Sequence, residues 1–346
     1  MIQGLERWKM TSRASMLGLT RAGIAGMAAI VTSSAEMSSV ALAAMGSPSP
    51  KQFGLQEPAT EIMRQIVTFH DALVWIITII TLFVLVLLLY VIWRFNETAN
   101  PTPSRTSHNT AIEVAWTVIP IFILLAIAVP SFKLLYKQYE FPKADVTVKA
   151  IGHQWYWTHE YPDTGFGFDT LMVKDEDLLK KKFGDAEFAT RYGKLPDLER
   201  AKRMYTDSAP LWLENKMLRI LSVDNELVLP VNKNVHILIT ADDVIHNWTI
   251  PSFGVKTDAV PGRTIATWFR AEKTGMFYGQ CSELCGKDHA AMPVAVRIVS
   301  EDVYAKWTVA MKAKDKKKAR EIIQQASVDE ETGRRLAAAS TTGSRR

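Results

Sequence analysis

The residues with the clearest chemistry lie in one short run, Cys281-Ser-Glu-Leu-Cys-Gly-Lys-Asp-His-Ala-Ala-Met292. This run holds both cysteines of the chain, Cys281 and Cys285, with His289 and Met292, and His246 lies upstream in Asp-Val-Ile-His-Asn-Trp. Soft sulfur ligands combined with imidazole favour copper, and a long axial thioether is typical of copper sites that transfer electrons. Two cysteines on one loop can bridge two copper ions, each with one histidine and one weak axial donor. Such a shared pair changes little in geometry when it gains or loses an electron, so the pattern predicts electron transfer rather than bond-making.

Three simpler interpretations of these residues stay open. Zinc bound by two cysteines and two histidines has the right number of ligands, but it leaves Met292 without a role. A disulfide between Cys281 and Cys285 is favoured in an oxidising compartment, but it leaves the histidines unexplained. Met292 taken singly is more often an ordinary core residue. The combined pattern favours copper, whereas no single residue does.

Two uncharged apolar runs, Ala72–Trp93 and Val114–Phe132, predict membrane-spanning helices. About 20 apolar residues cross a bilayer as a helix, and aromatic residues near the ends of the first run suit the interface. Pro120 and Pro130 interrupt the second run, but membrane helices tolerate proline. Because the connection between the runs is polar and contains prolines, the pair is predicted to form a hairpin. Both ends of the hairpin then face the same side of the membrane.

Residues 145–307 are predicted to form one domain built from β-strands. Short alternating runs such as Val146-Thr-Val-Lys-Ala-Ile are separated by Pro, Gly, Asn and Asp, which is typical of an antiparallel β-sandwich or barrel. A charged, helix-prone segment, residues 174–216, interrupts the pattern and is interpreted as a surface insertion. Beyond Asp302 a helix is expected, and residues 308–346 form a basic tail that is predicted to be disordered.

The charge of the chain excludes a basic nucleic-acid-binding domain. Its 41 Lys and Arg against 36 Asp and Glu give a net charge of +5, and the segment Met311–Arg346 accounts for all of this excess. Residues 1–44 have the composition of a targeting segment, in which basic residues precede the weakly apolar run Ala22–Val31 and small residues follow at Ala41–Ala44. A bacterial export signal is the first choice, and a mitochondrial presequence or a leader without an address are the alternatives. Residues 45–144 then comprise an N-terminal segment and the membrane hairpin.

The cysteine-containing run, read as Gly-Gln-Cys-Ser-Glu-Leu-Cys-Gly-Lys-Asp-His-Ala-Ala-Met-Pro, resembles the dinuclear copper loop of cytochrome c oxidase subunit II. Three further motifs resemble this family: Asp243-Val-Ile-His-Asn-Trp, Val255-Lys-Thr-Asp-Ala-Val-Pro-Gly-Arg263 and Gly152-His-Gln-Trp-Tyr-Trp157. The resemblance covers roughly Phe53 to Trp307, in the family's order. It implies a membrane-anchored, all-β protein in which a two-helix transmembrane hairpin is followed by a cupredoxin-like Greek-key β-barrel.

The resemblance also implies roles for individual residues. The two copper ions of a copper A centre would be held by His246, Cys281, Cys285, His289, Met292 and the backbone carbonyl of Glu283. The side chain of Glu283 would reach a magnesium ion shared with subunit I. Trp155 would be the surface aromatic where an electron enters from cytochrome c, and Glu113 would lie near the mouth of a proton path in subunit I.

The function implied by the resemblance is transfer of electrons from cytochrome c to the haem of subunit I, for reduction of oxygen coupled to proton pumping. The copper domain would face the periplasm of a bacterial inner membrane, or the intermembrane space of a mitochondrion. The expected partners are cytochrome c, subunit I with other oxidase subunits, and membrane lipid, with no nucleic acid.

Acidic residues that lie near Trp155-Tyr156-Trp157 or near the ligand loops in the sequence are expected to steer a basic haem protein. They are Asp163, Asp169, Asp242, Asp243 and Asp258. The rival function is a membrane-tethered copper carrier or assembly factor, although the sequence has no Met-rich or His-rich loading tract.

Overall fold

The computed structural model describes residues 46–102 and 104–343 of the chain. The chain divides into two compact units, Met1–Phe53 and Gly54–Arg346, and every helix and strand below belongs to the second unit. The predicted targeting segment, residues 1–44, lies outside the described residues.

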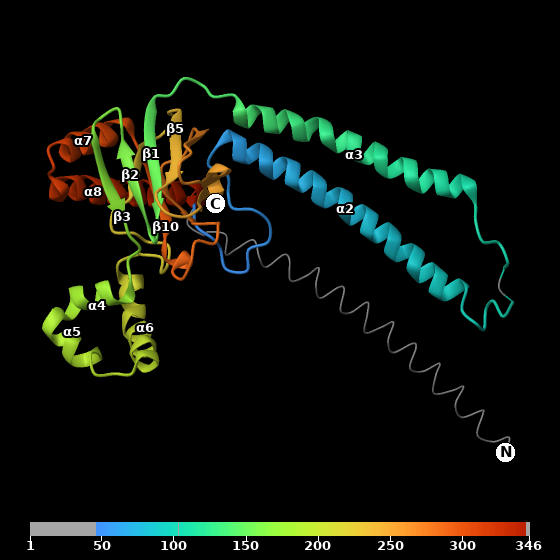
Figure 1. Ribbon diagram of the computed structural model, residues 1–346, viewed down its shortest axis with the longest axis horizontal. Helices are drawn as coiled ribbons and strands as arrows, with labels where there is room; N and C mark the ends of the chain where they lie inside the picture. The colour runs from blue at the N-terminus through green and yellow to red at the C-terminus, as the bar shows by residue number, and fades with distance from the viewer. Residues whose placement is uncertain (1–45, 103, 344–346) are drawn as a thin grey trace, which may run out of the picture. The chain divides into compact units, whose positions relative to one another are not determined.

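Two long helices, α2 (Glu61–Arg94) and α3 (Thr110–Tyr139), open the second unit (Figure 1). Thr60 caps α2 by accepting a hydrogen bond from the N–H of the third residue beyond it, and Asn109 caps α3 in the same way. Such side chains satisfy N–H groups that have no partner inside a helix. The caps explain why both helices begin well before the apolar runs in the sequence.

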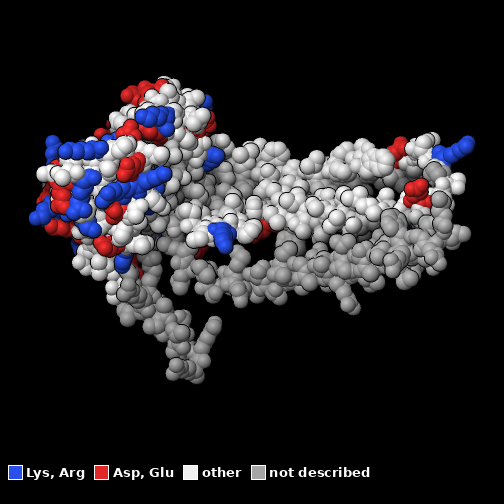
Figure 2. Space-filling view, turned by 90° about the horizontal axis from the view of Figure 1, so that it is seen from below, with Lys and Arg blue, Asp and Glu red and all other residues white. Residues whose placement is uncertain are grey.

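Both helices are long and apolar enough to cross a membrane. The predicted spans 72–93 and 114–132 lie inside them, and their large apolar side chains are exposed. Figure 2 shows that, on the face in view, charged side chains lie only near the ends of the two helices. Pro120 and Pro130 lie within α3, as predicted, without ending it. The predicted membrane hairpin is therefore confirmed, with longer helices than the apolar runs alone indicate.

The strands form a five-stranded sheet, a three-stranded sheet and a two-stranded ladder. The first sheet has the order β3-β2-β1-β5-β8, with β1 (Val146–His153), β2 (Tyr156–Tyr161), β3 (Phe166–Thr170), β5 (Val235–Ala241) and β8 (Ile265–Phe269). The second has the order β4-β10-β9, with β4 (Leu227–Pro230), β10 (Pro293–Val299) and β9 (Gly275–Gln280). The ladder pairs β6 (His246–Ile250) with β7 (Val255–Ala259).

The prediction of a helical hairpin followed by a β domain is confirmed, but the predicted antiparallel pairing holds only in part. Strand β1 pairs with β5 in parallel, and β4 pairs with β10 in parallel. Each of these pairs joins strands that are distant in the sequence, so short hairpin turns do not connect them. Among the described residues the three sets of strands remain separate ladders.

The core of the β domain is filled by aromatic and branched side chains. Strands β1 and β5 bury every second residue, whereas β4 and β6 are buried along their whole length. The largest fully buried side chains include Trp157, Trp248, Phe253, Phe269 and Phe277. Burial of one such side chain contributes roughly 1.5–3 kcal/mol. A core of this kind holds β6, β9 and β10 rigidly, and these strands carry the site described below.

The insertion, residues 174–216, folds as three helices between β3 and β4: α4 (Asp175–Phe183), α5 (Asp185–Tyr192) and α6 (Asp197–Glu214). It has a small core of its own, made by Leu178, Leu179, Tyr192, Leu211 and Trp212. Asp175 ties the helices together, because its carboxylate accepts hydrogen bonds from Ser208, Trp212 and Arg219. Figure 1 shows the three helices grouped apart from the sheets. The segment interpreted as an insertion thus lies between β3 and β4, which belong to different sheets, and it has a core of its own.

The prediction of a disordered tail is wrong for most of its length. Residues 301–343 form α7 (Glu301–Lys312) and α8 (Lys316–Gly343), which lie side by side (Figure 1). The composition explains the error: the tail is polar, but its Ala, Lys, Glu and Gln are strong helix formers. Ala319 is buried, and Ser327 accepts a hydrogen bond from Arg297 of β10 at 2.9 Å. The first half of α8 therefore packs onto the β domain.

The base of α2 is joined to the β domain by backbone and side-chain contacts. Ala59 donates to the carbonyl of Ser252 and accepts from the N–H of Glu272, both at 2.9 Å. Arg64 forms a bidentate ion pair with Glu272, with N–O distances of 2.5 and 3.0 Å. Met63 is buried against the domain, close to Gly254. The hairpin is thus anchored to the domain that carries the candidate site.

Candidate metal centre

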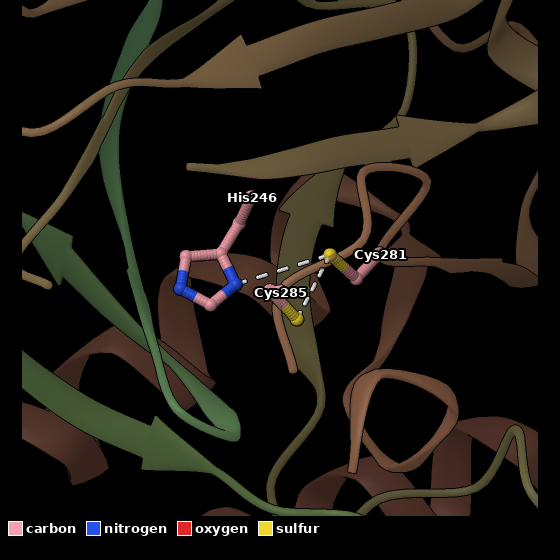
Figure 3. Close-up of side chains that lie close together, drawn as sticks. All are labelled: His246, Cys281 and Cys285. Carbon is pink, nitrogen blue, oxygen red and sulfur yellow. Dashed lines mark hydrogen bonds between the residues drawn. The ribbon is translucent and has the colours of Figure 1, made fainter. Parts of the chain in front are cut away.

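The predicted donor residues come from two segments that meet in space. His246 is the first residue of β6, and Cys281 follows directly after β9. The loop from Cys281 to Met292 ends where β10 begins, and β9 and β10 pair with each other, so one ladder fixes both ends of the loop. The backbone N–H of Cys281 also donates to the carbonyl of Met292 at 3.3 Å. Figure 3 shows the imidazole of His246 beside the sulfurs of Cys281 and Cys285.

The ligand atoms of His246, Cys281 and Cys285 lie within 4.8 Å of one another, and all three residues are buried. The two Sγ atoms are 3.9 Å apart, and Nδ1 of His246 is 3.9 Å from Sγ of Cys281. A disulfide bond is about 2.05 Å long. The cysteines are free thiols, which is the redox state that metal binding needs.

The remaining predicted donors divide between the two cysteines. Nδ1 of His289 lies 3.4 Å and Sδ of Met292 lies 3.5 Å from Sγ of Cys285. The carbonyl oxygen of Glu283 lies 3.2 Å from Sγ of Cys281. With the histidine of β6 beside Cys281, each cysteine therefore has one imidazole and one weak donor next to it.

The two thiols ionise in different surroundings. Burial acts to raise the pKa of Cys281, but hydrogen bonds with His246 and the backbone outweigh it and bring the pKa to about 7. Burial raises the pKa of Cys285 to about 12, and the sulfur of Cys281 adds to this shift. A thiolate is the form that binds metal. One thiol is thus close to its ligand form at neutral pH, and the second proton would leave on metal binding.

Asp243 holds the ring of His246 in the orientation that the site needs. Its Oδ1 lies 2.8 Å from Nε2 of His246, which leaves Nδ1 directed at Cys281. Burial acts to raise the pKa of Asp243, but hydrogen bonds from His246 and from backbone N–H groups lower it overall. Carboxylates commonly hold the second ring nitrogen of a histidine ligand in this way. The sequence indicates only a docking role for Asp243, although its place three residues before a candidate ligand is a signal for this support.

A glycine allows the two ligand-bearing strands to approach each other. A Cβ atom at Gly279 of β9 would lie 1.6 Å from the carbonyl oxygen of Thr249 in β6. Any side chain at this position would push β9 away from β6. Because β6 begins at His246 and β9 ends just before Cys281, the close contact of these strands brings the histidine and the cysteine loop together.

The chemistry of the donors fits copper. Thiol, thioether and imidazole form the soft set that copper electron-transfer sites use. A zinc ion would take two sulfurs and two imidazoles, and it would leave Met292 unused although its Sδ lies 3.5 Å from Sγ of Cys285. A zinc ion and a copper pair would use the same two sulfurs and two imidazoles. The number of bound ions and the role of Met292 therefore distinguish the zinc site from the copper site.

Two family profiles match the sequence. The one described as the transmembrane domain of cytochrome c oxidase subunit II matches residues 48–134, and the one described as its periplasmic domain matches residues 146–192 and 190–299. The chain belongs to the cytochrome c oxidase subunit II family. The two periplasmic matches meet at residues 190–192, which lie inside the helical insertion.

Relatives of subunit II occur in bacteria and in plants. Cytochrome c oxidase subunit 2 of Cereibacter sphaeroides is 42% identical over 288 residues, which is 82% of this chain and 88% of that protein. Cytochrome c oxidase subunit 2 of Zea mays is 39% identical over 266 residues, 75% of this chain and 89% of that protein. A crystal structure of the periplasmic domain of subunit II from Bradyrhizobium japonicum also matches, with 44% sequence identity and a TM-score of 0.38. The match covers 51% of this chain and 99% of the crystallised chain.

As a subunit II, the chain is part of a haem-copper oxidase, which is an oxidoreductase, and other oxidase subunits are its partners. Its two apolar helices make it a membrane-anchored protein. Membership of the family implies copper as the metal, and the cluster of His246, Cys281 and Cys285 is a site of the right chemistry.

The structure also places the other residues predicted for subunit II. Trp155 lies in the turn between β1 and β2, and its Nε1 donates to the carbonyl of Cys285 at 3.2 Å. Glu113 lies in the first turn of α3, where its carboxylate accepts from the backbone N–H of Asn109 at 3.2 Å. This contact is part of a helix cap. Trp155 therefore meets the metal loop, whereas Glu113 lies at the end of α3 that is distant from β1.

The five acidic residues predicted to dock cytochrome c are all exposed, and each has a local partner. Asp242 lies 3.7 Å from Nδ1 of His153, and Asp258 accepts from the side chain of Asn247. The other three accept hydrogen bonds from Thr147 N–H (Asp163), the Thr158 hydroxyl (Asp169) and Gln154 N–H (Asp243). Asp242, Asp243 and Asp258 are the acids that lie nearest to the ligand segment at His246.

Gln154 is a residue of the site that the sequence analysis missed. Its Nε2 donates to the carbonyl of Cys285 at 2.7 Å, although the residue itself is exposed. The signal was present in the motif Gly152-His-Gln-Trp-Tyr-Trp157, from which only Trp155 was assigned a role.

Proposed function

We propose that this chain is the subunit through which electrons reach the oxidase. It accepts electrons from cytochrome c at a dinuclear copper centre and passes them to the haem of subunit I, where oxygen is reduced to water with proton pumping. One observation carries the proposal. The sulfurs of Cys281 and Cys285 lie 3.9 Å apart, and each has one imidazole and one weak donor beside it. When bound, the two copper ions would supply a one-electron carrier that changes little in geometry.

The protein supplies the ligands and buries most of them. The copper ions would be held by His246, Cys281, Cys285, His289, Met292 and the carbonyl of Glu283. The relative exposure of Cys281, Cys285 and Met292 is only 5%, 3% and 1%. A buried site with fixed ligands suits electron transfer, whereas a copper carrier needs an open site that exchanges its metal. Burial therefore supports the redox subunit over the copper carrier or assembly factor.

Trp155 is proposed as the residue where the electron enters. It is half-buried, and its indole N–H contacts the carbonyl of the ligand residue Cys285. The ring can therefore meet a docked protein on one side and the metal loop on the other. The exposed acids Asp242, Asp243 and Asp258, with Asp163 and Asp169, would attract a basic cytochrome c and make its association depend on salt.

Two further roles follow from the family resemblance. The carboxylate of Glu283 is exposed on the metal loop and would reach a magnesium ion shared with subunit I. Glu113 would lie near the mouth of a proton path, beside its capping contact with Asn109. A bacterial inner membrane with the copper domain in the periplasm is the proposed location, and a mitochondrial inner membrane is the alternative.

The experiment that tests this function is stopped-flow reduction of the purified oxidase by reduced cytochrome c. We expect Trp155→Ala to slow electron transfer into the enzyme at least about tenfold, with both copper ions still bound. Trp268→Ala is the matched control, because Trp268 is also half-buried but donates to the carbonyl of Gln138 near the membrane helices. If Trp155→Ala changes the spectrum but not the rate, the assignment of Trp155 is wrong.

A further inference from the structure

The turn between β1 and β2, residues 154–155, contacts both ligand-bearing segments of the centre. On one side, Gln154 Nε2 and Trp155 Nε1 both donate to the carbonyl oxygen of Cys285, at 2.7 and 3.2 Å. On the other side, the backbone N–H of Gln154 donates to Oδ2 of Asp243 at 2.7 Å, and Oδ1 of the same carboxylate holds His246 at 2.8 Å. One residue thus links the cysteine loop to the histidine segment.

Close packing accompanies these hydrogen bonds on both sides. A Cβ atom at Gly152 would lie 2.8 Å from Cδ2 of His246, so the end of β1 lies directly against the imidazole ring. A Cβ atom at Gly286 would lie 3.1 Å from Nε2 of Gln154 and 3.2 Å from Cζ2 of Trp155. A side chain at Gly152 would displace the ring of His246, and one at Gly286 would crowd Gln154 and Trp155.

The side chains of the turn add to the backbone hydrogen bonds of the cysteine loop, such as the one from the N–H of Ser282 to the carbonyl of Asn247 at 3.2 Å. Between Cys281 and Met292 this loop has no strand, and its exposed residues include Glu283 and Leu284, the latter 78% exposed. Within the described residues, the side chain of Gln154 and the indole of Trp155 are the side chains that hold the Cys285 carbonyl. An amide donor of this kind is worth a modest net amount in stability, but here it fixes the position of a ligand residue.

We propose that Gln154 is a positioning residue of the metal centre. It fixes the distance between the Cys285 half and the His246 half of the donor set, and it holds the Trp155 indole against the Cys285 carbonyl. This inference rests on the proposed function, because it assumes that both halves bind one copper pair. Gln154 touches no metal donor atom itself, and it acts through Cys285 and through Asp243.

The test compares Gln154→Leu and Gln154→Glu in the full chain. Leucine removes the amide at similar volume, and glutamate keeps the shape but cannot donate to the carbonyl. Gln325→Leu is the matched control, because Gln325 is also exposed and its side-chain amide also donates a hydrogen bond, to Asp329 on α8 at 2.9 Å.

The first readout needs no metal. Hydrogen–deuterium exchange of the metal-free full chain is expected to show exchange in the 281–292 loop that is about two- to tenfold faster in both Gln154 variants, since one net hydrogen bond is lost. Exchange in β4 and β10 and in the Gln325→Leu control is expected to stay as in the wild type. Unchanged exchange of the loop in both Gln154 variants would overturn the proposal.

The second readout uses the copper-loaded oxidase. Both Gln154 variants are expected to bind as much copper as the wild type, but with altered copper hyperfine splitting and a shifted midpoint potential. A spectrum and potential identical to the wild type would contradict a positioning role. If the wild type itself binds one metal ion, the proposed function fails, while the exchange experiment still decides whether Gln154 holds the loop.

Discussion

Cys281 and Cys285 lie side by side, but each has its own imidazole and its own weak donor. Replacing either cysteine by serine removes a sulfur that both copper ions would share. We therefore expect Cys281→Ser and Cys285→Ser each to abolish the paired-copper spectrum. Met292→Leu is expected to keep both copper ions and to shift the midpoint potential, because an axial thioether tunes potential more than it holds metal.

Copper content and the electron paramagnetic resonance spectrum of the three variants provide the measurement. A serine variant that keeps the paired spectrum would show that its sulfur is not a bridge. Loss of all metal in Met292→Leu would show instead that the thioether is needed for binding.

His159 is a buried histidine outside the metal centre, and it makes the stability of the β domain depend on pH. Burial lowers its pKa to about 3, with Asp169 opposing the shift only weakly. The folded state therefore stays neutral at His159 where the unfolded state, with a pKa near 6.5, takes up a proton. Its contribution is full above pH 6.5 and is lost as the pH falls from there toward 3.

As the pH falls from 7.5 to 5.5, we expect His159 to lower the unfolding free energy of the β domain by roughly 1 kcal/mol. His159→Phe should remove this part of the pH dependence, and Thr170 would still donate to the carbonyl of Asn225. Chemical denaturation of the detergent-solubilised chain at both pH values, followed by tryptophan fluorescence, measures the difference. If the unfolding free energy changes with pH as much in the variant as in the wild type, another group is responsible for the pH dependence.

The candidate donor residues could be chosen from the sequence, whereas the residues that support them could not. Cysteine, histidine and methionine at short spacing have few other uses in combination. Gln154 acts through a hydrogen bond to Cys285, which is 131 positions away. Asp243 acts through a hydrogen bond with His246, which is 3 positions away. Glutamine and aspartate occur on any protein surface, so only the fold shows which of them supports a ligand.

At the level of elements, the sequence predicts best where one physical signal dominates. The uncharged runs fixed the existence of α2 and α3, but the caps at Thr60 and Asn109 determine where these helices begin. Alternation predicted β-strands such as β1 and β5, but not their parallel pairing, which depends on the whole domain. The prediction of disorder for the tail rested on its polar composition. Helix propensity and packing against Arg297 make the tail helical instead.

The structure of the tail leads to a prediction about α8. Deleting residues 316–346 is expected to lower the unfolding free energy of the β domain by about 2 kcal/mol, because half-buried Arg297 loses the hydroxyl of Ser327 and the packing of buried Ala319 is lost as well. Glu226 still pairs with the guanidinium at 2.9 Å, so the domain should stay folded. The copper spectrum should not change, since every proposed ligand lies between His246 and Met292.

Ser327→Ala is the milder companion variant and should lose only about 1 kcal/mol. Thermal unfolding and the copper spectrum of both proteins are the measurements. A deletion that removes copper binding, or that prevents assembly with the other oxidase subunits while the domain stays folded, would give α8 a role beyond packing.

The whole molecule combines a membrane anchor with a rigid β domain, and the two meet at Ala59, Met63 and Arg64. None of the proposed ligands comes from the hairpin, so the hairpin anchors the domain that carries the centre without contributing a ligand to it. Thr60 also donates its hydroxyl to the carbonyl of Phe253 at 2.8 Å. The full chain is therefore the form in which the centre is best measured.

The most direct test of the account is the number and coupling of metal ions in the full chain, purified in detergent and loaded with copper. Metal analysis should give two copper ions per chain, and electron paramagnetic resonance should show one unpaired electron split by both copper nuclei. The reason is the pair of sulfurs 3.9 Å apart with one imidazole beside each. One copper per chain with splitting from a single nucleus, or one zinc ion in its place, would contradict the account.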